Sequence, residues 1–457
     1  MKRNEFIKTS SAFVAGSVIL PSMACREKGR QQGAVAEANP ARTNWAGNYT
    51  YKAQNLHKPG SVEELQQLVR DLEPQKALGS RHCFNNIADS PLHQVSTENL
   101  RRLVAVDRDQ MQVTVESGMR YGDLAPLLEQ EGLALHNLAS LPHISIAGAC
   151  ATATHGSGVT NGNLSAAVAG MEVVLPGGDT LSLGRQDTDF DGAVVHLGAL
   201  GIVSRITLDV VPDYQVAQRV FLDLPFQTAV DHFDEIMSGG YSVSLFTDWQ
   251  AGKVSQVWVK RKADALSPAQ ETEYFGARAA DRDVHPIISL SAENCTPQMG
   301  VEGPWYERLP HFKMGFTPSS GDELQSEFFI ARDQAVEAFQ ALEAKRDLIG
   351  PQLQISEIRS VAADNLWLSP AYKRDVVAFH FTWKPHGPEV SELITMIEKE
   401  LSPFGVVPHW GKLFNLDPEV LRGRYEKMGD FMALARRMDP EGRLRNAYLD
   451  KNLYSAG

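Results

Sequence analysis

Hydrophobic residues recur at helical spacing in short windows of the N-terminal half of the chain. Leucine and valine follow the capping-box pair Ser61 and Glu64 at intervals of three and four, which predicts a helix there. Residues 122–130 form a second helical window. Strands are predicted where the pattern alternates: two hairpins around the turns at 107–109 and 176–179, and a half-buried strand at 205–211.

In the C-terminal half, longer helical windows mix with strands. Residues 333–346 and 431–438 are predicted helices, whereas residues 261–300 are polar and poorly patterned. Residues 354–361 and 376–383 are predicted strands. Helices and strands in separate blocks, without an internal repeat, indicate an α+β fold.

The two strands of the C-terminal half place polar side chains on one face. Glu357 and Arg359 are two residues apart, so both leave the same face of a strand. In the next strand the large apolar residues share one face, and His380 and Thr382 share the other. Lys412 follows an aromatic residue and a glycine, a setting that favours partial desolvation of its ammonium group. By periodicity alone, these residues are also typical of surface ion pairs or of a strand face exposed to solvent.

The composition is that of a globular protein with a sizeable core. Of the 457 residues, 43% are hydrophobic and 22% charged, which excludes an intrinsically disordered chain. The net charge of −12, without basic runs, argues against nucleic acid as a partner, because phosphate contacts need clustered Lys and Arg. After residue 25, no run of ~18 apolar residues predicts a membrane span.

The first 25 residues have the order of an export signal: a basic start, an apolar run and small residues at the end. An amphipathic helix is the alternative. The start resembles a twin-arginine signal with Asn4 in place of the second arginine, so the export route stays open. Cys25 resembles a lipoprotein cleavage site. Residues 1–25 are therefore predicted to be a signal, residues 26–41 a flexible tether, and the protein periplasmic or lipid-anchored.

Several common chemistries have no sequence signal here. Cys83, Cys150 and Cys295 form no CxxC pair, so neither a zinc site nor a disulfide framework is predicted, although one bridge stays possible. No histidine spacing predicts a metal site, and no GxSxG elbow indicates a serine hydrolase.

Two loops rich in small residues, 79–85 and 148–158, are candidate phosphate cradles. Small side chains let backbone N–H groups approach a phosphate closely, and hydroxyls add donors. Neither loop matches the GxGxxG or GxxxxGK[ST] pattern, and each is also typical of a tightly packed turn.

Six motifs follow one another along the chain: Asn44-Trp45-Ala46-Gly47-Asn48, the loop around His82, Asn137 to His143, Ala153 to Gly158, Glu357-Ile358-Arg359 and His409-Trp410-Gly411-Lys412. Taken in this order, they resemble those of the alditol (xylitol) oxidases, members of the vanillyl-alcohol-oxidase flavoprotein superfamily and relatives of the sugar-lactone oxidases. The similarity runs from about residue 42 to 450. It implies a two-part FAD-binding domain over residues 42–213, an α+β substrate domain over 214–420, and a return of residues 421–457 to the FAD-binding domain.

The resemblance implies that His82 carries the flavin covalently through its 8α-methyl carbon. A neutral imidazole suits this role because it is a nucleophile near neutral pH. The sulfur of Cys83 is an alternative attachment point for the flavin. Arg81 replaces the glycine usual in this turn, so its backbone is either compatible with a side chain or strained. Cys150 lies past the position of a second linking cysteine in doubly attached relatives, so a single link is expected.

The resemblance also supplies residue sets. The expected cofactor-binding residues are Ala77, Leu78, Gly79, Ser80, Arg81, His82, Ser140, Ser145, Gly148, Thr152, Ala153, Thr154, His155 and Ile202. The expected substrate-binding residues are Ser140, Glu357, Arg359, His380, Thr382 and Lys412, of which His380, Arg359, Lys412 and Glu357 are also expected to be catalytic.

The implied reaction is oxidation of a terminal CH₂OH of a polyol such as xylitol or sorbitol to the aldose. Hydride passes to flavin N5, and O₂ is reduced to hydrogen peroxide. His380 is the candidate base, and Arg359 and Lys412 would stabilise the developing alkoxide-like oxygen. Alternatives are an aldonolactone oxidase, a dehydrogenase that uses another acceptor, and an exported sugar-binding lipoprotein. A monomer is expected.

Overall fold

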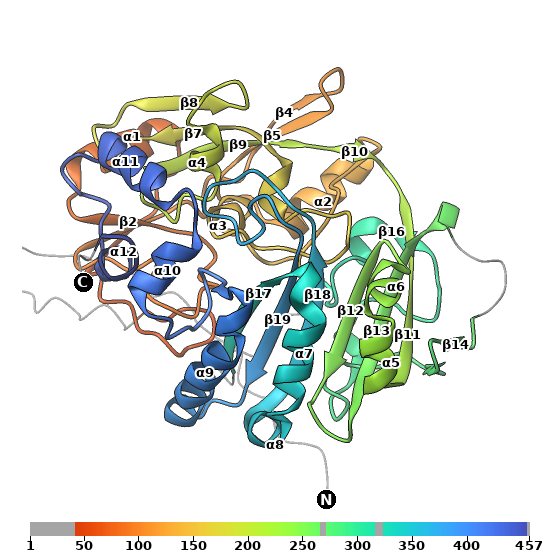
Figure 1. Ribbon diagram of the computed structural model, residues 1–457. Coiled ribbons are helices and arrows are strands. Elements are labelled where there is room, and N and C mark those ends of the chain that lie inside the picture. Colours follow the sequence, from red (N-terminus) through yellow and green to blue (C-terminus); the bar gives the residue numbers. More distant parts are fainter. Residues whose placement is uncertain (1–41, 266–270, 316–322, 455–457) are drawn as a thin grey trace, which may run out of the picture. The chain divides into compact units, whose positions relative to one another are not determined.

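The computed structural model describes residues 42–265, 271–315 and 323–454. The predicted export signal, the possible lipid anchor at Cys25 and the tether over 26–41 lie outside the described residues. Within the described ranges, no helix combines the length and the hydrophobicity needed to cross a membrane. The described residues form one unit, and Figure 1 labels many of its elements.

The N-terminal segment builds a small parallel sheet covered by the first predicted helix. Ser61 caps this helix by accepting a hydrogen bond from the Glu64 amide at 3.2 Å. The Glu64 carboxylate reaches back to the Gly60 amide at 2.7 Å, one residue before the position of an ideal capping box. The elements are β1 (Asn55–His57), α1 (Val62–Asp71), β2 (Gln75–Leu78) and β3 (His93–Ser96), with strand order β1-β3-β2.

A five-stranded antiparallel sheet follows, and both predicted hairpins are confirmed within it. The strand predicted at 205–211 begins earlier, at Ile202, and ends at Asp209. Helix α2 (Tyr121–Gln130) matches its predicted window, and the short α3 (Ile146–Ala151) lies in the second small-residue loop. The strands, in sheet order, are β4 (Leu103–Asp107), β5 (Gln112–Glu116), β9 (Ile202–Asp209), β7 (Val168–Val174) and β8 (Thr180–Gly184).

A ten-stranded sheet carries the C-terminal half, with helices α5, α6, α7 and α9 packed on one face (Figure 1). Val377, Phe379, Phe381 and Trp383 point into that apolar layer, as the alternation predicts. The helices are α5 (Phe226–Asp231), α6 (Phe233–Ser238), α7 (Ala335–Glu343), α8 (Arg346–Ile349) and α9 (Gly387–Leu401). The strands, in sheet order, are β14 (Glu273–Tyr274), β15 (Ala277–Ala279), β11 (Gln215–Pro225), β13 (Lys253–Lys262), β12 (Ser242–Thr247), β18 (Leu353–Val361), β19 (Val376–Trp383), β17 (Leu324–Ala331) and β20 (Val407–Pro408), with β16 (Gly303–Pro304) beside β11.

The helix predicted over 333–346 is wrong in extent. A 3-10 turn precedes α7, and the regular helix ends at Glu343. The last residue of its buried stripe is Leu342, so no apolar side chain anchors a further turn to the sheet.

The C-terminal helices pack into the same core cluster as the five-stranded sheet. Leu421, Phe431 and Tyr448 belong to the cluster that contains residues of α2 and the five-stranded sheet. The Asn446 side-chain amide donates to three backbone carbonyls within residues 86–89. These helices are α10 (Pro418–Arg424), α11 (Met428–Met438) and α12 (Ala447–Leu449).

Candidate active site

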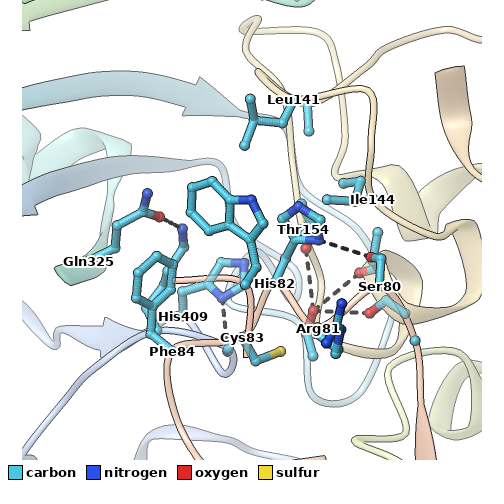
Figure 2. Close-up of a pocket in the computed structure, with 18 of the residues that line it drawn as sticks. Ser80, Arg81, His82, Cys83, Phe84, Leu141, Ile144, Thr154, Gln325 and His409 are labelled. Atoms are coloured by element: carbon cyan, nitrogen blue, oxygen red, sulfur yellow. Dashed lines mark hydrogen bonds between the residues drawn. The ribbon is translucent and has the colours of Figure 1, made fainter. Parts of the chain in front are cut away.

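A cavity of about 410 Å³ is lined by the small-residue loops of the N-terminal part and by the polar face of the ten-stranded sheet. Figure 2 shows the loop from Ser80 to Phe84 beside Thr154, Gln325 and His409. All the predicted substrate-binding residues line this cavity. All the predicted cofactor-binding residues except Ala153 line it as well. Ala153 is 1% exposed and has φ of 54°, so it is a buried residue in the left-handed region that fixes the backbone of the loop without lining the cavity.

Two glycines bring the small-residue loops into close contact. A Cβ added to Gly79 or to Gly148 would lie 2.7 Å from the Ser145 hydroxyl oxygen, which is too close for an unstrained contact. The Ser145 amide donates to the Ser80 hydroxyl at 3.0 Å. The loops therefore form one wall in which only the smallest residues fit.

His82 is held as a neutral, oriented imidazole. Its ring stacks on Trp45 with centroids 5.3 Å apart, and Nδ1 lies 3.0 Å from the Ser80 hydroxyl. Burial, with the nearby His143 and Lys412, lowers the pKa of His82 to about 3. The ring is therefore uncharged near neutral pH and keeps a nucleophilic nitrogen lone pair.

The neighbouring cysteines lack such activation. Burial raises the pKa of the Cys83 thiol to about 11 and that of Cys150 to about 12, so both stay protonated near neutral pH. Cys83 lines the cavity, whereas Cys150 does not and lies 3.7 Å from the Tyr121 hydroxyl. Cys295 is buried elsewhere, and all three described cysteines are unpaired.

Arg81 occupies the left-handed region of backbone space, with φ of 66°. A side chain there costs roughly 1 kcal/mol relative to glycine, so the turn is mildly strained. Its carbonyl accepts a hydrogen bond from the Trp45 amide at 2.8 Å. This contact connects the strained turn to the aromatic ring that supports His82.

Three strands bring two carboxylates and a histidine into one row on the polar face. In the antiparallel register, Glu327 of β17 lies opposite His380 of β19, and His380 lies opposite Glu357 of β18. All three are buried and line the cavity. The two predicted strand pairs, Glu357 with Arg359 and His380 with Thr382, are therefore brought together as expected.

Glu327 is the central acceptor of this face, and the sequence analysis missed it. It accepts from Arg359 Nη2 at 2.9 Å and from His155 Nε2 at 3.1 Å, and lies 3.5 Å from His380 Nδ1. Burial opposes its ionisation, but these three partners lower the pKa of Glu327 well below its ordinary value. The alternation of residues 324–331, in which Gln325 shares a face with Glu327, is the signal that could have revealed it.

Arg359 connects the two walls of the cavity. Its Nη1 donates to the Ser140 hydroxyl at 3.2 Å, while its Nε has no hydrogen-bond partner although it is buried. His380 Nδ1 is also buried and without a hydrogen bond of good geometry. Unpaired buried polar atoms beside a cavity indicate that a polar ligand completes them.

His380 and Lys412 supply the titratable groups on this face. His380 Nε2 lies 3.1 Å from the Thr382 hydroxyl, and burial lowers its pKa, so the imidazole is neutral and able to accept a proton. Lys412 Nζ donates to the Gln325 side-chain carbonyl and lies 5.0 Å from the centre of the Phe84 ring. Burial lowers the pKa of Lys412 as well.

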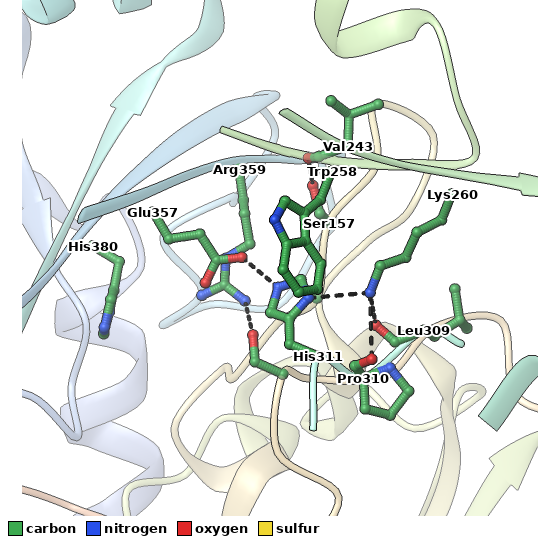
Figure 3. A network of polar contacts seen from close by, with 12 residues as sticks. Ser157, Val243, Trp258, Lys260, Leu309, Pro310, His311, Glu357, Arg359 and His380 are labelled. Carbon is green, nitrogen blue, oxygen red and sulfur yellow. Dashed lines mark hydrogen bonds and ion pairs between the residues drawn. The ribbon is translucent and has the colours of Figure 1, made fainter. Parts of the chain in front are cut away.

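Two further segments contribute residues that the sequence analysis did not select. His311 Nε2 lies 2.7 Å from Glu357 Oε1, an arrangement shown in Figure 3. Residues 285–287, from the poorly patterned stretch, also line the cavity. Among the described residues, no group of three or more His, Cys, Asp or Glu side chains is placed to hold a metal ion.

Comparisons with known proteins identify the family. A model described as "FAD binding domain" matches residues 53–184, and one described as "D-arabinono-1,4-lactone oxidase" matches residues 323–452. An alditol oxidase from Streptomyces sp. (strain IKD472 / FERM P-14339) is 45% identical over 412 residues, which cover 90% of this chain and 98% of the relative. This chain belongs to the alditol oxidase family.

More distant matches place this alditol oxidase family member among related flavoproteins. An L-gulono-1,4-lactone dehydrogenase from Mycobacterium tuberculosis (strain ATCC 25618 / H37Rv) is 29% identical, with coverage of 90% of this chain and 98% of the relative. The structure of a cholesterol oxidase from B. sterolicum superimposes with a TM-score of 0.74 at 14% identity and coverage of 90% and 96%. The expected family, the α+β FAD-binding fold and the class of FAD-dependent oxidoreductase are confirmed.

The cavity lining fits the flavin nucleotide that this alditol oxidase family uses. The glycine and serine wall leaves room for a phosphate to approach backbone amides. The His82 ring, uncharged near neutral pH, lines the same wall. The opposite wall offers Lys412 and Arg359, cations that complement the negative charge of a reduced flavin.

Proposed function

We propose that this protein oxidises a terminal primary alcohol of a polyol to the aldose, with FAD as cofactor and O₂ as acceptor. In the balanced reaction, RCH₂OH and O₂ give RCHO and H₂O₂. The carrying observation is the row Glu327, His380 and Glu357, with Arg359 beside it, on the wall that faces the small-residue loops. Carboxylates, an imidazole and cations on one face match the many hydroxyl groups of a polyol.

Each group on this face has a distinct task. Bound FAD would supply the hydride acceptor and pass the electrons to oxygen. The neutral imidazole of His380 accepts the hydroxyl proton, while Arg359 and Lys412 stabilise the negative charge that develops on that oxygen. Glu357 and Thr382 bind neighbouring hydroxyls. Glu327 fixes Arg359 and His380 through its two oxygens.

Anaerobic reduction of the bound flavin tests the substrate class, and it does not depend on which electron acceptor reoxidises the flavin. We expect xylitol and sorbitol to bleach the flavin absorbance much faster than a γ-lactone does. The lactone-oxidase domain match over 323–452 makes an aldonolactone the second candidate. Rapid bleaching by the lactone with none by either polyol would select that candidate instead.

The covalent link is a separate proposal about His82. His82→Ala should fold but lose covalent FAD. The neutral His82 imidazole has an unprotonated nucleophilic nitrogen, whereas the thiol of the neighbouring Cys83 stays protonated near neutral pH. Mass spectrometry of the denatured protein measures the adduct. Cys83→Ala is the matched control and should keep the adduct, since its thiol stays protonated. An adduct that persists in His82→Ala and disappears in Cys83→Ala would make Cys83 the attachment point.

Export is proposed from the sequence of the first 25 residues alone. The mature N-terminus should lie at or near Cys25, outside the cytoplasm, because the order of basic, apolar and small residues is that of a signal. N-terminal sequencing and fractionation of the native cells measure this. Cys25→Ala should abolish any lipid adduct. An uncleaved N-terminus in the cytosolic fraction would contradict the proposal.

A further inference from the structure

A fully buried lysine lies behind the polar face. Lys260 of β13 is 1% exposed and does not line the cavity. Its ammonium nitrogen donates to the Leu309 carbonyl and lies 3.2 Å from His311 Nδ1 and 3.5 Å from the Pro310 carbonyl (Figure 3). Among the described residues, no carboxylate lies within ion-pair distance of it. A buried ammonium group without a counter-ion is costly, and burial lowers the pKa of Lys260 to about 7.

Glu357 and Lys260 together hold one tautomer of His311. The Glu357 carboxylate only accepts hydrogen bonds, so His311 Nε2, 2.7 Å from Glu357 Oε1, carries the ring hydrogen and donates it. Nδ1 of the neutral ring is then an acceptor, and Lys260 Nζ donates to it at 3.2 Å. Burial and the adjacent Lys260 charge lower the pKa of His311 to about 4, which keeps the ring neutral.

The rest of the fold holds the His311 ring in place. The ring packs edge-on against Trp258 and Phe246, with centroids 5.0 and 5.3 Å away. The His311 amide donates to the Ser140 carbonyl at 3.1 Å. The ring therefore cannot turn away from Glu357 without disturbing both an aromatic cluster and the loop that carries Ser140.

The result is an asymmetric environment for the Glu357 carboxylate. Oε1 accepts from His311 and lies 3.6 Å from Arg359 Nε. Within the described part of the chain, no donor is hydrogen-bonded to Oε2. Because Glu357 lines the cavity, the free oxygen is available to a hydroxyl group of the ligand.

We propose that Lys260 and His311 are positioning residues that present Glu357 Oε2 to a substrate hydroxyl, and that they determine the affinity for polyols. The proposal rests on the proposed function for the nature of the ligand. The step it affects is binding of a hydroxyl that neighbours the oxidised one, not hydride transfer. Loss of either residue should therefore raise the dissociation constant for xylitol more than it lowers the limiting rate of flavin reduction.

Anaerobic stopped-flow reduction of the holoenzyme by xylitol separates these two quantities. Lys260→Met and His311→Leu should each raise the dissociation constant about tenfold or more, the effect of weakening one charged hydrogen bond, with a limiting rate within about threefold. His311→Gln should recover most of the affinity, because its amide can accept from Lys260 and donate to Glu357. In a Glu357→Gln background, Lys260→Met should have little further effect.

A second measurement does not depend on turnover. Nitrogen NMR of histidine-labelled holoenzyme, with His311 assigned through His311→Gln, should show a neutral ring protonated at Nε2. Lys260→Met should leave the ring hydrogen on Nε2 but shift the Nδ1 resonance, because Nδ1 loses its hydrogen-bond donor. If that variant does not fold, the xylitol affinities of His311→Leu and His311→Gln are compared instead.

The outcomes are distinguishable from failure of the proposed function. Failure of all polyols to reduce the wild-type flavin would reject the proposed function while the tautomer result still stood. An Nδ1 resonance that is the same in wild type and Lys260→Met, or unchanged xylitol affinity in the Lys260 and His311 variants, would overturn the positioning role. Failure of His311→Gln to recover affinity beyond His311→Leu would overturn it as well.

Discussion

Lys412→Ala should lower the rate constant for reduction of the bound flavin by xylitol by about 10²-fold or more. Its ammonium group is half-buried beside Gln325 and Phe84 and stabilises the oxygen that becomes negative as hydride leaves. Removal of a charge that acts in the transition state has an effect of this size. Anaerobic stopped-flow measurement isolates this step from the reaction with oxygen.

Two further variants make the Lys412 result specific. Lys412→Arg should recover little activity, because a planar guanidinium cannot occupy the place of a compact ammonium. Lys373→Ala removes an exposed lysine that pairs with Glu426 on the surface, and should leave the rate unchanged. A near-wild-type rate in Lys412→Ala, at full flavin content, would exclude Lys412 from the catalytic groups.

Glu327→Leu should lower the free energy of unfolding by about 3–5 kcal/mol. The substitution removes the carboxylate that is hydrogen-bonded to the buried Arg359 guanidinium, leaving only the longer contact with Glu357, and removes the acceptor for His155. Breaking a buried ion pair from one side costs this much because the remaining charge stays desolvated. Urea unfolding of wild-type and variant holoenzyme, matched for flavin content, measures the difference.

The surface carboxylate Glu426 provides the control for this stability prediction. It pairs with Lys373 at 3.5 Å, and both side chains are more than half exposed. Glu426→Ala should therefore change stability little, since water replaces the lost contact. Equal small losses in Glu327→Leu and Glu426→Ala would mean that Glu327 does not balance the buried charges.

The polar strand face could be predicted because strand alternation is a local property. Glu357 and Arg359, and likewise His380 and Thr382, are two residues apart, so each pair must share a face wherever the strand lies. Which face was functional did not follow from periodicity. The order of motifs along the chain supplied that information.

Glu327 and His311 could not be found in the same way. Glu327 reaches His380 only through the pairing of β17 with β19, and strand register between distant segments has no local signal. His311 lies outside regular helices and strands, and long-range contacts with Ser140 and Glu357 fix its position. The helix predicted at 333–346 was too long because the window counted polar residues beyond Leu342 as part of the helix.

Simultaneous measurement of oxygen uptake and hydrogen peroxide formation by the purified holoenzyme tests the central claim most directly. With xylitol as the only reductant, we predict one peroxide formed for each O₂ consumed and each aldose produced. Wild-type protein with intact flavin that consumes no oxygen with xylitol or sorbitol, or forms no peroxide while the polyol is oxidised, would contradict the account.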